Sequence, residues 1–190
     1  MPEILFVCTG NTCRSPMAEF LFNRLARERK MEHWQAKSVG LAALPGDGIS
    51  THAHTVLKEE AIDSAAHRSR ILDQESLERA VLVLTMTEGH RDMVIARYPG
   101  YRDKIFTLKE FAAKIGESPG VDKLDLDIMD PFGQGEEVYR ATRDEIKAAL
   151  EAIIGNLHQF EIQAGNLVKK ENNTNRGDNM KIAIGSDHAG

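Results

Sequence analysis

The sequence predicts an α/β fold with an open, parallel, four-stranded sheet that has helices on both faces. Three observations predict it: short strand-like runs that are mostly unbroken apolar sequence, helical patterns between them, and turn residues that separate the two. The strands are expected at Ile4–Val7, Ala36–Val39, Val81–Leu84 and Ile105–Leu108. Short continuous apolar runs are typical of strands covered on both faces, and intervening helices make neighbouring strands parallel. A ligand is then expected at the carboxyl ends of the strands.

A helix is expected after each strand. Met17, Leu21 and Leu25 repeat at helical spacing, and Ser50 and Asp73 have the side chains of helix N-caps. The expected helices are Pro16–Lys30, Thr51–Ala61, Asp73–Arg79, His90–Arg97, Phe111–Ile115 and Glu136–Phe160.

Composition limits the class of protein. The chain has 190 residues, 42% of them hydrophobic, which is enough for one sizeable core and a tail. Its formal net charge of −5 argues against nucleic acid as a partner. No apolar run approaches the roughly 20 residues that span a bilayer, so we expect a soluble, cytoplasmic protein with no membrane partner.

The two cysteines, Cys8 and Cys13, lie in one predicted loop. This placement excludes a disulfide framework and gives little support to a zinc site, and we expect neither a metal nor a cofactor. Two interpretations of Cys13 stay open. It captures an oxidised Cys8 as a short reversible disulfide, or it only fills space.

The loop that follows Ile4–Val7 has the features of an anion site. Ser15 is suited to the N-cap and Pro16 to the first helical position, so a helix is expected to begin directly after Arg14. Amides of the turn and of the helix N-terminus then favour an anion, and Arg14 adds a two-pronged donor. Such surroundings favour the thiolate of Cys8, which makes it a candidate nucleophile.

Neighbouring residues support this interpretation over a buried cysteine followed by an ordinary capped helix. Gly10 permits a tight turn, Asn11 tolerates left-handed backbone, and the hydroxyl of Ser15 is able to donate to a thiolate.

The run Val7–Glu19 closely resembles the phosphate loop of the low-molecular-weight protein tyrosine phosphatases, and Thr12, in place of an aliphatic residue, resembles the bacterial protein-arginine phosphatases within that family. The resemblance covers about residues 1–160. It implies the flavodoxin-like fold of these phosphatases, phosphorylated proteins as substrates and a buried ion pair of Glu19 with His67 behind the loop. It places these residues around phosphate or a similar oxyanion: Thr9, Gly10, Asn11, Thr12, Cys13, Arg14 and Ser15.

A long acidic loop, residues 116–135, contains Asp130-Pro131-Phe132-Gly133. An aspartate followed by proline has little freedom, so Asp130 is held over a neighbouring loop. The motif resembles the general-acid motif of the same family, and phenylalanine followed by glycine is similar to its arginine-specific branch. Phe132 is then a wall of the pocket.

These residues predict phosphoryl transfer in two steps. Cys8 attacks phosphorus, Arg14 and the loop amides hold the oxygens, and Asp130 protonates the leaving group and later activates water. We expect phosphoarginine to be the preferred substrate, because Thr12 and the Phe-Gly pair resemble the arginine-specific branch. The alternatives are a low-molecular-weight tyrosine phosphatase and a non-catalytic phosphate-binding or redox-sensing module.

The C-terminus has a different composition. We expect a phosphatase domain at 1–163 and a flexible linker at 164–179, which is rich in Asn, Lys and Gly. The segment 180–190 resembles the beginning of ribose-5-phosphate isomerase B and is too short to form that domain, so it is expected to be the stub of a further domain.

Overall fold

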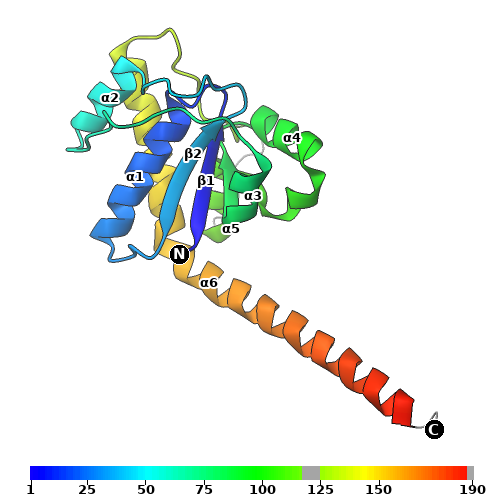
Figure 1. Cartoon of the computed structure of the whole chain (residues 1–190). Coiled ribbons are helices and arrows are strands. Elements are labelled where there is room, and N and C mark those ends of the chain that lie inside the picture. Colours follow the sequence, from blue (N-terminus) through cyan, green and yellow to red (C-terminus); the bar gives the residue numbers. More distant parts are fainter. Residues whose placement is uncertain (117–124, 188–190) are drawn as a thin grey trace. The chain divides into compact units, whose positions relative to one another are not determined.

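The computed structural model describes residues 1–116 and 125–187, with side chains described as far as residue 163. Four parallel strands form one sheet in the order β2-β1-β3-β4. Figure 1 shows β1 and β2 side by side. Their bounds are Glu3–Cys8 for β1, Gln35–Gly40 for β2, Ala80–Thr85 for β3 and Ile105–Thr107 for β4. The predicted α/β fold is confirmed, with β1 inside the sheet.

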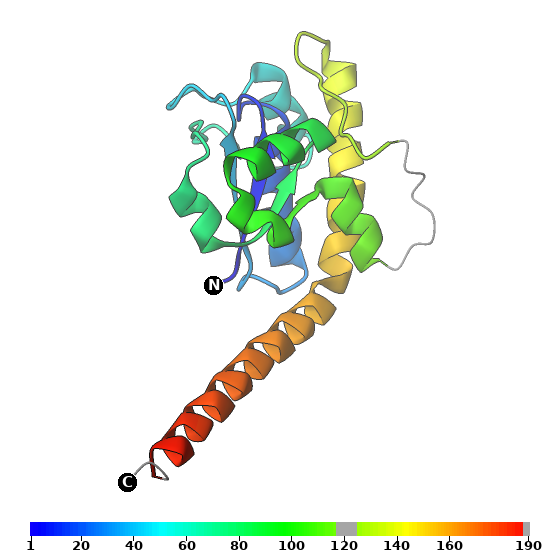
Figure 2. The same ribbon diagram turned by 90° about the vertical axis from the view of Figure 1, so that its right-hand side faces the viewer.

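The helices follow the strands in the predicted order, apart from one 3-10 helix that was not predicted (Figure 2). They are α1 (Arg14–Glu28), α2 (Thr51–Lys58), α3 (Gln74–Arg79), α4 (Glu88–Arg97), the 3-10 helix η1 (Pro99–Lys104), α5 (Leu108–Ile115) and α6 (Glu136–Asp187). Two predicted N-caps are confirmed: the Ser50 side chain accepts from the backbone N–H of Ala53, and Asp73 from that of Ser76.

Alternate side chains of β1 face opposite helices. The ring of Phe6 lies 6.1 Å from that of Phe22 in α1, so α1 covers one face of the sheet. On the other face Leu5 belongs to a buried cluster with Leu77 of α3 and Val94 of α4. Because β1 is covered on both faces, its C-terminal residue Cys8 is held by the core of the domain.

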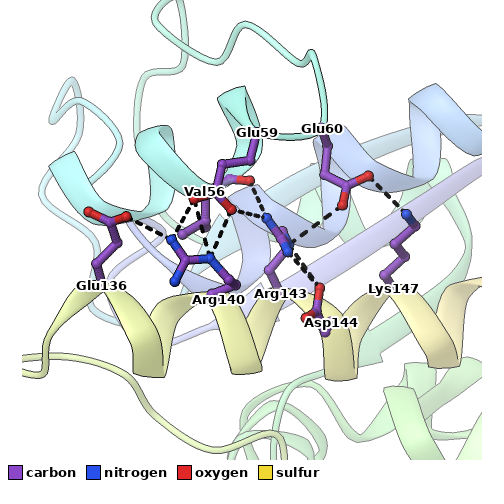
Figure 3. A network of polar contacts seen from close by, with 8 residues as sticks. All are labelled: Val56, Glu59, Glu60, Glu136, Arg140, Arg143, Asp144 and Lys147. Atoms are coloured by element: carbon purple, nitrogen blue, oxygen red, sulfur yellow. Dashed lines mark hydrogen bonds and ion pairs between the residues drawn. The ribbon is translucent and has the colours of Figure 1, made fainter.

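An ion-pair network joins the end of α2 to the first turns of α6 (Figure 3). Glu59 accepts from Arg140 and from Arg143, whose Nη1 lies 2.6 Å from Glu59 Oε2, and Lys147 Nζ lies 2.8 Å from Glu60 Oε2. The hydrogen bonds from Arg140, and then from Arg143, lower the pKa of Glu59 to about 2. The network therefore holds the first turns of α6 to the end of α2.

The C-terminal segments differ from their predicted local structure. Instead of ending near Phe160, α6 continues to Asp187 through the predicted linker 164–179 and into 180–190. Neither segment contains proline, and a helix already begun adds one hydrogen bond for each residue fixed. The chain divides into compact units at Ile154 and Gly155, inside this helix. The assignment of 180–190 to a further domain stays a prediction, and 188–190 lie outside the described residues.

The acidic loop is described only in part, since residues 117–124 lie outside the described residues. Among the residues that are described, no helix is long and apolar enough to cross a membrane.

Candidate active site

A pocket of about 240 Å³ opens at the carboxyl end of β1. Its walls come from the turn after β1 and from the end of the acidic loop. The lining residues are Cys8, Thr9, Gly10, Thr12, Cys13, Arg14, Asp130 and Phe132. All eight are among the ten predicted site residues. The other two, Asn11 and Ser15, are fully buried and do not line the pocket.

Cys8 ends β1, and its side chain is buried next to the first turn of α1. The Sγ atom lies 2.9 Å from Ser15 Oγ, whereas the carbonyl of Val39 lies 3.3 Å from the same hydroxyl. Ser15 has one hydroxyl hydrogen, and Sγ is the nearer acceptor. A thiolate at this place therefore receives a hydrogen bond at the N-terminus of a helix, where negative charge is favoured.

The prediction that Ser15 is an N-cap is wrong. Helix α1 begins at Arg14, and Cys13 occupies the N-cap position without a capping hydrogen bond from its side chain. The Ser15 hydroxyl instead accepts from Asn11 Nδ2 at 2.9 Å and contacts Cys8. A tertiary contact with the cysteine has replaced the local contact that the residue type favours.

The side chain of Asn11 holds the loop together from behind. Its φ of 55° lies in the left-handed region that asparagine tolerates. Its Nδ2 donates to Ser15 Oγ and to Ser38 Oγ, both at 2.9 Å, while Oδ1 accepts from the backbone N–H of Arg70 at 2.9 Å. Ser38 in turn donates to Glu19 Oε2. Both N–H groups of this buried amide are therefore used, and Oδ1 uses one of its two lone pairs.

The backbone carbonyl of Asn11 is also fixed. It accepts from Ser69 Oγ and from His67 Nε2, each at 2.8 Å. A carbonyl only accepts, so Nε2 of this buried histidine carries a hydrogen. The resemblance implied an ion pair of His67 with Glu19. In the structure His67 donates to the backbone carbonyl of Asn11. Glu19 is linked to the side chain of Asn11 through Ser38.

Gly40, at the end of β2, lies against the loop and was not among the predicted site residues. A Cβ atom there would lie 2.6 Å from the carbonyl oxygen of Thr9 and 2.9 Å from the backbone nitrogen of Asn11. The neighbouring amides of Leu41 and Ala42 donate to the carbonyls of Cys8 and Thr9 at 3.0 and 2.9 Å. Only glycine permits this approach of the two backbones.

Arg14 connects the phosphate loop to the acidic loop. Its side chain is buried; Nη1 donates to the carbonyl of Ile128 at 3.0 Å, and Nη2 lies 3.4 Å from Asp130 Oδ2. The Asp130 side chain is 57% exposed, and its Oδ1 accepts from the N–H of Phe132 at 3.1 Å. Phe132, itself 76% exposed, forms an open apolar rim. The predicted nucleophile, cation and acid thus line one pocket.

His90, in the first turn of α4, was not predicted to belong to the site. Its Nε2 lies 2.8 Å from Thr9 Oγ1, and its buried Nδ1 has no hydrogen-bond partner in the described part of the chain. Burial, and then the charge of Arg14, lower the pKa of His90 to about 4. The ring is therefore neutral near pH 7. Its separation of 81 residues from Thr9 left no local pattern to reveal it.

Cys13 is a free buried thiol, as is Cys8. Its Sγ donates to Ser50 Oγ at 3.4 Å and lies 3.3 Å from the hydroxyl of Tyr139 in α6. Burial, and then the contact with Cys13, raise the pKa of Tyr139 to about 12. Both cysteines line one pocket. The disulfide that Cys13 would form with an oxidised Cys8 stays a prediction. The described residues contain no group of three or more metal-ligating side chains.

Comparison with known proteins places this site in a family. Residues 3–164 match the model of a family described as low molecular weight phosphotyrosine protein phosphatase. The chain belongs to this family. Within it, this chain is 46% identical over 151 residues to a protein-arginine-phosphatase of Geobacillus stearothermophilus. The match covers 80% of this chain and 93% of the relative. It is 31% identical to the tyrosine phosphatase PtpB of Staphylococcus aureus, covering 76% of this chain and 91% of the relative.

Solved structures agree with this placement. The YwlE arginine phosphatase of Geobacillus stearothermophilus superposes on this chain with a TM-score of 0.73 at 42% identity, covering 86% of this chain and 97% of the YwlE chain. A second YwlE structure, of a mutant with a phosphorylated active site serine, gives a TM-score of 0.72 at 40% identity over 82% of this chain and 95% of that one.

Proposed function

We propose that this protein is a protein-arginine phosphatase that hydrolyses phosphoarginine through a phosphocysteine intermediate. The observation that carries the proposal is the shared pocket of Cys8, Arg14 and Asp130. Greater identity to protein-arginine-phosphatases than to a tyrosine phosphatase, 46% against 31%, supports the choice of substrate.

In the first step the thiolate of Cys8 attacks phosphorus, and the bond from phosphorus to the guanidinium nitrogen breaks as the sulfur–phosphorus bond forms. Arg14 exchanges its ion pair with Asp130 for the phosphoryl oxygens, which carry the developing charge. Asp130, released from that pair, takes up a proton from solvent and gives it to the leaving nitrogen, which departs as the guanidine of the arginine. Before the attack, the Ser15 hydroxyl stabilises the thiolate.

In the second step a water molecule attacks the phosphocysteine. Asp130, now a carboxylate, takes a proton from this water, and the sulfur–phosphorus bond breaks. Inorganic phosphate leaves, and Cys8 is again a thiolate. The half-exposed position of Asp130 at the pocket supports both roles, because water reaches the carboxyl group from outside.

The choice of phosphoarginine over phosphotyrosine rests on Thr12, since both substrates can use Asp130 as the acid. A guanidinium is more basic than a phenol, so its departure depends more on such a proton donor. Thr12 lines the pocket with a hydroxyl where an aliphatic side chain would favour an aromatic ring. We also propose phosphorylated proteins as partners, free phosphate as a ligand of the loop, and action in the cytoplasm, where thiols stay reduced.

The test compares two peptides of one sequence that carry either phosphoarginine or phosphotyrosine. We expect the larger kcat/KM for phosphoarginine and no turnover of either peptide by Cys8→Ser, which should still bind phosphate. A larger kcat/KM for phosphotyrosine would make the protein a tyrosine phosphatase. Phosphate binding without turnover of either peptide would leave a non-catalytic phosphate-binding or redox-sensing module.

A further inference from the structure

We propose that Asp127 is a positioning residue for the general acid: it fastens the segment that carries Asp130 to the N-terminus of α4. The inference rests on the proposed phosphatase function and adds to it a residue that does not touch the substrate. The carboxyl group of Asp130 is half-exposed, so burial does not hold it at the pocket and other contacts must do so.

Two hydrogen bonds make the fastening. Asp127 Oδ1 accepts from the backbone N–H of Glu88, the first residue of α4, at 2.8 Å. The next residue, Ile128, donates its N–H to the carbonyl of Met86 at 2.8 Å, and its side chain is buried. A carboxylate at a helix N-terminus is favoured by the helix dipole and satisfies a donor that has no partner within the helix.

The fastened backbone leads directly to the reacting groups. The carbonyl of Ile128 accepts from Arg14 Nη1 at 3.0 Å, and Asp130 follows two residues later, 3.4 Å from Arg14 Nη2. Pro131 then restricts the backbone of Asp130. Asp127 therefore holds the start of the segment to α4. Arg14 contacts the segment at the carbonyl of Ile128 and, before phosphate binds, at Asp130.

The first turn of α4 contacts the phosphate loop as well. His90 Nε2 in this turn lies 2.8 Å from Thr9 Oγ1. One rigid turn is thus bonded to the loop that holds phosphate and to the segment that supplies the proton. Such a common support fixes the distance from acid to phosphorus, on which proton transfer depends.

Asp125 provides a matched control on the same segment. It is also an aspartate, 77% exposed, and it pairs with Lys109 Nζ of α5 at 3.2 Å rather than with α4. Replacing it changes the net charge by the same amount as replacing Asp127 but leaves the hydrogen bond to Glu88 in place.

A second variant removes the same hydrogen bond from the other side. Glu88 is at the first helical position of α4, where proline is tolerated, and the preceding residue Thr87 has the extended backbone that proline requires. Glu88→Pro therefore deletes the N–H donor and keeps Asp127. If Asp127→Ala does not fold, Glu88→Pro still tests the proposal.

The experiment measures kcat/KM for phenyl phosphate and for para-nitrophenyl phosphate, whose better leaving group needs less help from an acid. We expect Asp127→Ala and Glu88→Pro to lower kcat/KM roughly tenfold or more for phenyl phosphate and only about twofold for para-nitrophenyl phosphate. Asp127→Asn, which keeps an acceptor oxygen, should recover most of the loss. Asp125→Ala should match the wild type.

The two substrates separate positioning from a general structural effect. The same loss on both, or no loss on either, would overturn the role of Asp127, and so would an Asp127→Asn variant as impaired as Asp127→Ala. Wild-type protein that turns over neither aryl phosphate nor phosphoarginine would instead overturn the proposed function.

Discussion

Substituting Gly40 by alanine tests whether close backbone packing shapes the phosphate loop. The added Cβ would lie 2.6 Å from the carbonyl oxygen of Thr9, and ordinary van der Waals contact begins at 3.4 Å, so that oxygen must move by roughly 0.8 Å. It cannot move alone, because it accepts a hydrogen bond from the N–H of Ala42 and belongs to the turn that follows Cys8.

Two effects of different size are expected. Overpacking of this kind costs about 1–3 kcal/mol of folding free energy, and a displacement near 1 Å in a catalytic loop lowers the rate by about 10². We therefore expect Gly40→Ala to stay folded in thermal unfolding and to lose kcat/KM about 10²-fold for phosphoarginine. The inhibition constant of inorganic phosphate should rise in parallel.

Gly48→Ala is the matched control. It changes a glycine of the connection between β2 and α2 to alanine, and a Cβ there would meet nothing within 4 Å. We expect its kcat/KM to equal that of the wild type. If Gly40→Ala also retained wild-type kcat/KM, the contact of β2 with the loop would have no part in catalysis.

Three further variants test separate parts of the account. Thr12→Ile should lower the ratio of phosphoarginine to phosphotyrosine turnover roughly tenfold; an unchanged ratio would leave Thr12 without a role in selection. His90 has a pKa of about 4 in the folded protein against 6.5 ordinarily, so the folded state binds fewer protons than the unfolded state between pH 4 and pH 6.5. The protein therefore loses up to about 3 kcal/mol of unfolding free energy as pH falls from 6.5 to 4. His90→Asn should therefore show a shallower loss of unfolding free energy over that range, and parallel curves would contradict the burial of a neutral ring. Glu59→Gln should lower the melting temperature at pH 7, and the difference from wild type should shrink below the usual carboxyl range near 4.5, because the folded pKa of Glu59 is about 2; a difference that persists at pH 2 would show that its charge is not responsible.

Local sequence patterns were sufficient to predict the strand, the turn and the helix that carry the site. The apolar run of β1, the turn and the following amphipathic helix predicted where Cys8 and Arg14 lie, because a parallel strand and the next helix necessarily meet at the sheet edge. The left-handed backbone of Asn11 agreed with its residue type, since asparagine adopts this conformation more readily than most other residues.

Contacts between distant segments could not be predicted in the same way. Ser38 and His90 reach the loop from 27 and 81 residues away, and no spacing in the chain indicates such contacts. Ser15 was misassigned for the related reason that a buried thiol and amide compete for its hydroxyl. The length of α6 was missed because the composition of 164–179 favoured a linker, whereas the segment contains no proline to interrupt a helix that has already begun.

The most direct test of the central claim is to identify the atom that carries the phosphoryl group during turnover. Protein mixed with a phosphoarginine peptide is quenched within the first turnover and analysed by peptide mapping and mass spectrometry. The account predicts one phosphoryl group on the peptide that contains Cys8, bound to sulfur and absent from Cys8→Ser at the same time point. Phosphate on another residue, or complete turnover with Cys8 never modified, would contradict it.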